Sequence, residues 1–74
     1  PDFSEYYRSL ANLYFDNHKY NDAIFNYKKC LNLNSNDVKS YLMIGLSYKQ
    51  IKKETLGLKW FKKFLSQCEK DCFL

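Results

Sequence analysis

Apolar side chains recur at intervals of three and four in the first part of the chain and form two stripes. These stripes consist of Tyr7, Leu10, Ala11 and Tyr14, then Tyr20, Ala23, Ile24 and Tyr27. Such spacing places each set on one face of a helix. Between the stripes, residues 17–19 include poor helix formers and no apolar residue, which predicts a short turn joining two antiparallel helices.

The same pattern returns 34 residues further on, which indicates an internal repeat. Its second copy consists of Tyr41, Ile44, Gly45, Tyr48, Gly57, Leu58 and Phe61. We therefore expect an all-α fold of two repeats, 4–37 and 38–71, with helices at 4–16, 21–33, 38–51 and 54–71. The polar run 32–37 is the predicted turn between the repeats, and Asp37 is expected to cap the third helix.

Side-chain size along the stripes predicts where the helices cross. Small residues stand at Ala11, Ala23, Gly45 and Gly57, and large rings stand at Tyr14, Tyr27, Tyr48 and Phe61. The small residues would let two backbones approach while the rings fill the space beside them, so both sets are predicted core positions. In the last helix the apolar stripe continues through Leu58, Phe64, Leu65, Cys68 and Cys72. Trp60 falls beside this stripe and is expected to be either a half-exposed surface ring or a contact with a neighbouring chain.

The composition is compatible with one small folded domain, 1–74, of marginal stability, with 46% hydrophobic and 19% aromatic residues. Its net charge of +4 comes from the second half. Residues 1–37 hold four basic and five acidic side chains, whereas residues 38–74 hold eight and three. Lysine-rich outer helix faces explain this asymmetry better than a nucleic-acid surface does. Neither a membrane span nor a signal peptide is visible in the sequence.

No group of residues points to catalysis, to a cofactor or to a metal. The single His18 falls in a predicted turn, and the sequence offers no Ser/His/Asp set and no glycine loop for phosphate, so we expect no enzyme activity and no cofactor. Cys68 and Cys72 lie four residues apart, but zinc needs more ligands than these two. An odd count of three cysteines favours a reducing compartment, and hence an intracellular, cytoplasmic protein.

The two stripes of the first copy, extended by Cys30 and Leu31, resemble the tetratricopeptide repeat (TPR), a helix-turn-helix unit of 34 residues. This resemblance covers nearly the whole chain and implies a helical solenoid with right-handed superhelical stacking. The second copy departs from the family pattern, because Glu54 stands in place of Tyr20 and bulky Phe64 in place of Cys30. The bulk of Phe64 predicts that the stack ends there or continues with a more distant helix.

The resemblance also implies a protein-binding function, because the first helices of successive TPRs line a concave groove that holds a peptide or a partner helix. The implied binding residues are Arg8, Asn12, Lys39, Leu42, Met43, Leu46 and Lys49. An apolar patch with a lysine rim is typical of an anchor pocket. Arg8 and Asn12 match two places of the carboxylate clamp found in some TPR domains, whereas Met43 replaces the asparagine usual at the next place.

Three functions of different classes are compatible with these observations. The first is an adaptor or scaffold module for a protein or peptide partner. A second is a structural segment covered by further repeats or by another copy of itself, because the open ends of a two-repeat stack predict self-association. The third, an RNA-binding helical repeat, is disfavoured because RNA-reading repeats have another period, and no membrane partner is expected. The start at Pro1 and the apolar end Phe73-Leu74 favour a piece of a longer protein.

Overall fold

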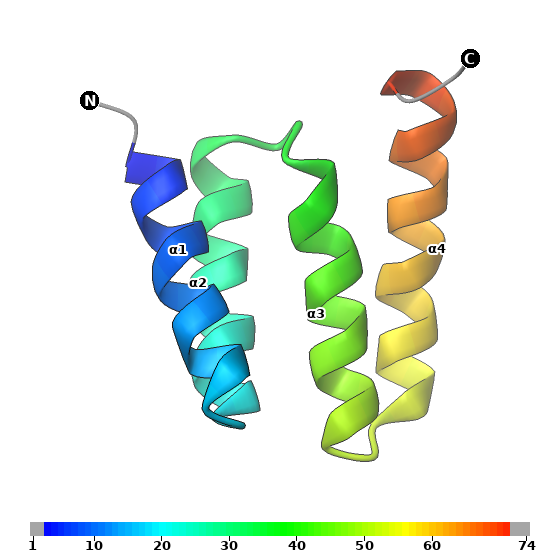
Figure 1. The fold of residues 1–74 in the computed structure, drawn as a ribbon. Coiled ribbons are helices and arrows are strands. Elements are labelled where there is room, and N and C mark those ends of the chain that lie inside the picture. The colour runs from blue at the N-terminus through cyan, green and yellow to red at the C-terminus, as the bar shows by residue number, and fades with distance from the viewer. Residues whose placement is uncertain (1–2, 72–74) are drawn as a thin grey trace.

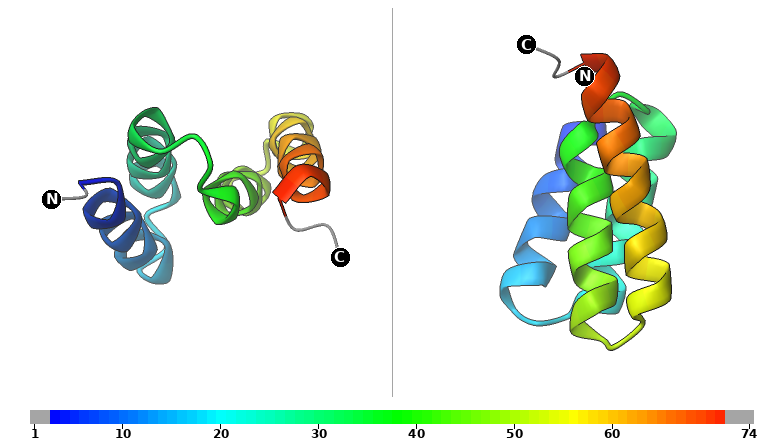
Figure 2. Two further views of the ribbon diagram at one scale, coloured as in Figure 1. Left: turned by 90° about the horizontal axis from the view of Figure 1, so that it is seen from above. Right: turned by 90° about the vertical axis from the view of Figure 1, so that its right-hand side faces the viewer.

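The computed structural model describes residues 3–71, with the side chains of residues 3–68. Within these residues the chain forms four α-helices and no strand: α1 (Phe3–Asp16), α2 (Tyr20–Leu33), α3 (Val38–Gln50) and α4 (Glu54–Asp71) (Figure 1). The helices form two antiparallel hairpins that lie side by side. Seen from above, α1 and α3 occupy one row and α2 and α4 the other (Figure 2). The all-α fold of two helix-turn-helix repeats is confirmed.

Both hairpins turn with the same backbone arrangement at the end of their first helix. In the first repeat, the N–H of His18 donates to the Phe15 carbonyl at 3.0 Å, and the N–H of Lys19 donates to the Tyr14 carbonyl at 2.8 Å. This pair of bonds is the Schellman motif, which needs a left-handed residue just after the helix. His18 and its counterpart Lys52 adopt that conformation with φ of 63° and 65°. Neither is glycine, so the sequence carries no signal for this type of turn.

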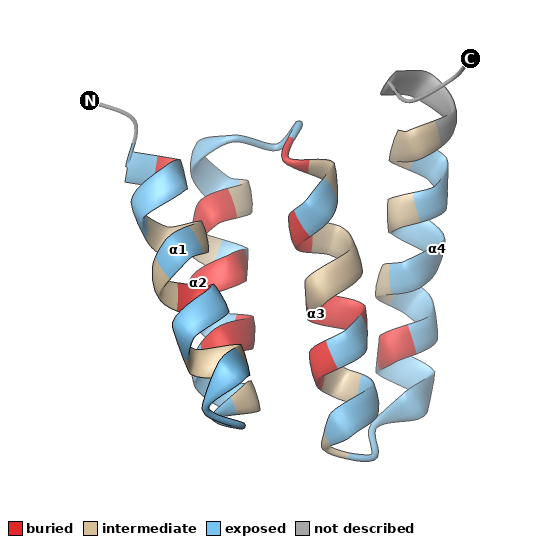
Figure 3. Cartoon of the chain, viewed as in Figure 1, coloured by how far each residue is buried: buried red, intermediate tan, exposed pale blue. Residues whose placement is uncertain are grey.

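The core is a cluster of buried side chains from the first three helices. Its members are Ala11, Ala23, Ile24, Tyr27 and Ile44. Buried positions are coloured red along these three helices in Figure 3. Because α3 packs against α2 as well as against α4, Ile44 joins the first repeat to the second. The small residues predicted at helix crossings are buried as expected. Gly45 and Gly57 also face one another closely between α3 and α4.

Some core positions predicted for α4 are wrong. Phe61 is 40% exposed, although its counterpart Tyr27 in the first repeat is 0% exposed. Leu58 and Leu65 are exposed as well, and Phe64 is half-buried. The physical reason is position in the stack: α3 covers Tyr27, whereas no helix of the described part of the chain lies beyond α4. Cys72, Phe73 and Leu74 lie outside the described residues.

Candidate functional site

A pocket of about 410 Å³ lies where α1, α2 and α3 meet, and we call it the inter-repeat pocket. It is lined by Arg8, Asn12, Tyr27, Lys39 and Met43. Four of these five residues belong to the binding set expected from the sequence, and they come from the first helices of both repeats. Tyr27 was expected only in the core. Its ring is buried, yet it also borders this pocket, as its place on the α2 face toward α1 and α3 allows.

Arg8 is held in place by two acidic side chains. Its Nη1 donates to Oδ2 of Asp37 at 2.9 Å, and its Nη2 lies 3.5 Å from Oε2 of Glu5. The Asp37 side chain is only 4% exposed, whereas that of Arg8 is 35% exposed. The guanidinium therefore links α1 to the start of α3 and still reaches solvent at the pocket, where its remaining N–H groups can donate.

The expectation that the Asp37 side chain caps α3 is wrong. Asp37 occupies the N-cap position, but its carboxylate makes no capping hydrogen bond. It accepts instead from Arg8 and from the Cys30 thiol, whose Sγ lies 3.2 Å from Oδ2. The Ser40 hydroxyl in turn donates to Cys30 Sγ at 3.5 Å. The Asp37 carboxylate thus binds Arg8, 29 positions away, rather than a backbone N–H at the start of α3, because a charge-assisted hydrogen bond to a guanidinium is stronger than one to an amide.

Burial governs the protonation of the Cys30 thiol behind this pocket. Desolvation is the main cause that raises its pKa to about 11, and the neighbouring Asp37 carboxylate adds to it. A thiol with so high a pKa is protonated and poorly nucleophilic at neutral pH. Cys30 therefore serves as a small packing residue and a weak donor, as its place on the apolar stripe predicts.

Asn12 and Tyr27 are joined directly, because the Tyr27 hydroxyl donates to Oδ1 of Asn12. Burial is the main cause that raises the pKa of Tyr27 to about 12, with the charge of Asp16 contributing. The phenol therefore keeps its proton and continues to donate to Asn12. Arg8 and Asn12 do lie at one pocket, as a clamp requires, but each already has an internal hydrogen-bond partner.

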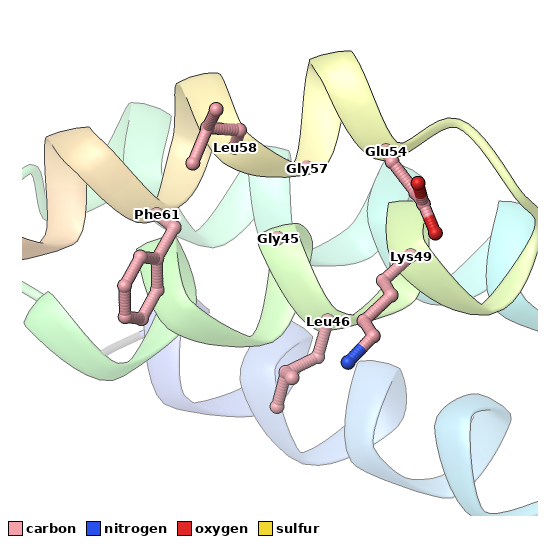
Figure 4. A pocket seen from close by; sticks show the side chains of 7 residues that line it. All are labelled: Gly45, Leu46, Lys49, Glu54, Gly57, Leu58 and Phe61. Atoms are coloured by element: carbon pink, nitrogen blue, oxygen red, sulfur yellow. The ribbon is translucent and has the colours of Figure 1, made fainter.

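The rest of the expected binding set lies outside this pocket. Leu42 is half-buried, and Leu46 and Lys49 line a second pocket of about 410 Å³ between α3 and α4. We call it the end pocket. It is lined by Gly45, Leu46, Lys49, Glu54, Gly57, Leu58 and Phe61 (Figure 4). The expected groove thus consists of two hollows, one between the repeats and one beside the last hairpin.

The end pocket has a glycine floor, because Gly45 and Gly57 line it at the place where the backbones of α3 and α4 approach closely (Figure 4). Leu58 and Phe61 extend from α4, while Leu46 and Lys49 extend from α3. From the sequence Leu58 and Phe61 were assigned to the core, so their role at a surface hollow was missed. The sequence differences between the two repeats, such as Phe64 in place of Cys30, were the only indication that α4 has a different packing environment from α2.

Trp60 is half-buried, as expected, and has contacts within the chain. Its ring centroid lies 6.0 Å from that of Tyr41. The Nζ atoms of Lys28 and Lys63 lie 5.4 Å and 4.2 Å from the centroid of the indole ring. The indole thus forms cation–π contacts with lysines of α2 and α4, and it lines neither pocket.

The described residues contain neither a cluster of potential metal ligands nor a helix that could cross a membrane. No group of three or more His, Cys, Asp or Glu side chains in that part of the chain is arranged to hold a metal ion. None of the helices described combines the length and the apolar character that crossing a bilayer requires. The side chains that line the two pockets offer hydrogen bonding, charge pairing and apolar contact.

Comparisons with known proteins agree with this geometry. A family model described as TPR repeat matches residues 11–52, and a second model, described as tetratricopeptide repeat, matches residues 38–71. The first match runs from within α1 through α3 and includes every residue that lines the inter-repeat pocket except Arg8. The second spans α3 and α4. Searches of curated proteins and of solved structures found no match.

Proposed function

Since this chain belongs to the tetratricopeptide repeat family, whose repeats are generally protein–protein interaction modules, we propose that it is an adaptor that binds a peptide segment at the inter-repeat pocket. The observation that carries the proposal is the meeting of Arg8, Asn12, Lys39 and Met43 at one hollow. Residues 31 positions apart in sequence converge there only because the repeats stack. The two repeats act together as one binding domain in this proposal, in a cytoplasmic setting.

The chemistry of the pocket supports a partner with acidic and aliphatic side chains. Lys39 is exposed, and the half-exposed guanidinium of Arg8 keeps donors toward solvent, so two cationic groups border the hollow. Met43 adds a flexible apolar surface that adapts to different aliphatic side chains. In this proposal Leu42, which is half-buried on the same helix but outside the lining of the pocket, adds an apolar contact. An extended peptide that alternates acidic and aliphatic residues matches both features.

The partner's terminal carboxylate is a further candidate ligand. Arg8 has five N–H donors and uses them in part on Asp37 and Glu5. The remaining donors, with the exposed Asn12 beside them, form a partial carboxylate clamp in this proposal. Its strength is reduced by the nearby Asp37 and Glu5, because their negative charges offset part of the positive field at Arg8.

A synthetic peptide array tests the proposal. The peptides are eight-residue segments that alternate acidic and aliphatic residues, each made with a free and an amidated C-terminus. For the best binder, fluorescence anisotropy should show about tenfold weaker binding to Lys39→Glu, because the reversed charge repels the peptide. Lys59→Glu on the exposed side of α4 is the matched control and should bind like the wild type.

The results distinguish peptide binding at the inter-repeat pocket from recognition of a terminal carboxylate there. A preference for the free C-terminus that disappears in Asn12→Ala supports the clamp, whereas equal binding of both forms leaves an internal peptide segment as the ligand. If no peptide of the array binds, or if Lys39→Glu and Lys59→Glu weaken binding equally, the inter-repeat pocket is not the binding site.

A further inference from the structure

The outer side of α1 carries an apolar stripe that nothing in the described chain covers. Its members are Phe3, Tyr6 and Leu13, which are 59–61% exposed. Intervals of three and seven residues place them on one helix face. At the opposite end of the stack lies the end pocket, with exposed Leu58 and Phe61 around its glycine floor. The chain therefore has an apolar projection at one end and an apolar hollow at the other.

The repeat register relates these two surfaces to the interface between the repeats. Tyr6 and Leu13 lie 34 positions before Ser40 and Ser47, which are completely buried on α3. Ser40 contacts Cys30 of the first repeat. The stripe on α1 thus occupies the positions that, one repeat later, are buried in the stack.

The face of α2 that packs against α3 has its counterpart on α4, at the end pocket. Ala23, Ile24 and Tyr27 are buried in the first repeat. Their counterparts 34 positions later are Gly57, Leu58 and Phe61. Each end of the chain therefore displays one side of a contact that the chain already makes internally. In such a contact, Leu13 of one copy takes the register position of Ser47, and Leu58 of the other copy takes that of Ile24.

Side-chain volumes at the two ends are complementary. Within the chain, small Ser40 and Ser47 lie at the positions that face a well-filled first repeat. At the ends, the larger Tyr6 and Leu13 would face a hollow of about 410 Å³ with a glycine floor. Large side chains opposite an open pocket can reach the packing density of a protein interior. The larger side chains of the α1 stripe, compared with Ser40 and Ser47, are thus matched by the open space of the end pocket.

Charge favours contact between unlike ends. Residues 1–37 hold four basic and five acidic side chains, whereas residues 38–74 hold eight and three. Glu5 and Asp16 are exposed on α1, and Lys49 borders the end pocket. The end pocket itself holds one charge of each sign, Lys49 and Glu54, but the second half of the chain as a whole is basic. Two basic second repeats would repel one another, while an acidic first repeat and a basic second repeat attract.

We propose that a second copy of this chain docks head to tail, with the stripe Phe3, Tyr6 and Leu13 of one copy seated in the end pocket of the next. This contact continues the stacking of the repeats across two molecules. It is heterologous, so each copy keeps a free stripe or a free pocket, and association proceeds to longer species as concentration rises. The inter-repeat pocket takes no part and stays available for a peptide.

Sedimentation velocity over a range of protein concentrations tests the proposal. The wild type should shift from monomer to dimer and larger species. Leu13→Lys blocks the stripe, Leu58→Lys blocks the end pocket, and each variant alone should remain monomeric. Both leucines are exposed, so circular dichroism should show unchanged helix content. Leu33→Lys is the matched control, since Leu33 is 57% exposed on α2, and it should associate like the wild type.

The decisive arm is the mixture of the two blocked variants. Leu13→Lys keeps an intact pocket and Leu58→Lys keeps an intact stripe, so an equimolar mixture should form a one-to-one dimer and nothing larger. A wild type that stays monomeric at the highest concentration overturns the proposal and leaves a different segment as the occupant of the end pocket. A mixture that remains monomeric, or a blocked variant that still associates alone, equally overturns the head-to-tail arrangement.

Discussion

A β-carbon on Gly57 would lie 2.9 Å from the carbonyl oxygen of Gly45, so these two glycines let α3 and α4 cross closely. The neighbouring atom is backbone, which cannot move aside as a side chain can. Helix propensity favours alanine over glycine by about 1 kcal/mol. Overpacking costs about 1–3 kcal/mol, so Gly57→Ala should still lower the free energy of unfolding. Urea denaturation at low protein concentration measures it.

Ser66→Ala is the control for the glycine substitution, because Ser66 is exposed on the same helix. Alanine there changes helix propensity without a steric contact, so stability should rise by a few tenths, roughly 0.3 kcal/mol. Gly45→Ala should cost less than Gly57→Ala, since its β-carbon would lie 3.1 Å from the nearest atom. If Gly57→Ala is as stable as the wild type, α3 and α4 can separate without loss.

Substituting larger residues for the alanines at the α1–α2 crossing should destabilise the fold, as Gly57→Ala should. Ala11 and Ala23 are both completely buried. Ala11→Leu and Ala23→Leu should each lower stability by about 1–3 kcal/mol, because added methylenes force the helices apart. Ser9→Leu on the exposed side of α1 is the control and should change stability little. Equal melting temperatures for all three variants and the wild type would contradict the observed crossing.

The Arg8–Asp37 pair joins the first helix to the start of the third and should contribute to stability. Arg8→Met leaves the buried Asp37 carboxylate without its ionic partner and should cost about 1–3 kcal/mol. Asp37→Asn in the Arg8→Met background should recover part of this loss, because the unpaired charge is removed. A double-mutant cycle by urea denaturation measures the coupling. Glu5→Gln, at the exposed end of the network, should have little effect.

Lys52 is strained by its left-handed backbone conformation, with φ of 65°. Lys52→Gly should raise stability by about 0.5–1 kcal/mol, since glycine adopts this conformation without a steric penalty. The benefit is smaller than the full penalty because glycine also increases the entropy of the unfolded chain. Lys53→Gly, where φ is not positive, should lower stability. A thermal melt in which Lys52→Gly is no more stable than Lys53→Gly would refute this expectation.

Stability should fall in alkaline solution because the pKa values of Cys30 and Tyr27 are raised by burial, to about 11 and about 12. In the unfolded chain these groups ionise near 9.0 and 10.0, so above those values the unfolded state loses protons that the fold retains. Their stabilising contribution is full below pH 9.0 and is lost as pH rises through 11 and 12. Urea midpoints across this range measure the loss, and Cys30→Ala should reduce its first part.

Periodicity and side-chain size were sufficient to predict the helices, the two repeats and their close crossings. Each depends on features that lie within one helix or one hairpin. The spacing of Ala11 and Tyr14 places them on a common face whatever the rest of the chain does. A small residue on such a face permits a close crossing wherever the partner helix lies. The convergence of Arg8, Asn12, Lys39 and Met43 could also be inferred, because it follows from the register of two stacked repeats.

Only the tertiary structure decided how far residues at equivalent positions of the two repeats are buried. Tyr27 and Phe61 hold the same place in their repeats, yet only Tyr27 is fully buried, because burial depends on whether another helix lies over that place. Asp37 looks like a helix cap in sequence, but its partner is Arg8, which comes within 2.9 Å only after the repeats have packed. The local sequence pattern thus determined the helices and their apolar faces. Contacts between distant segments determined which of these faces are buried and that Asp37 pairs with Arg8.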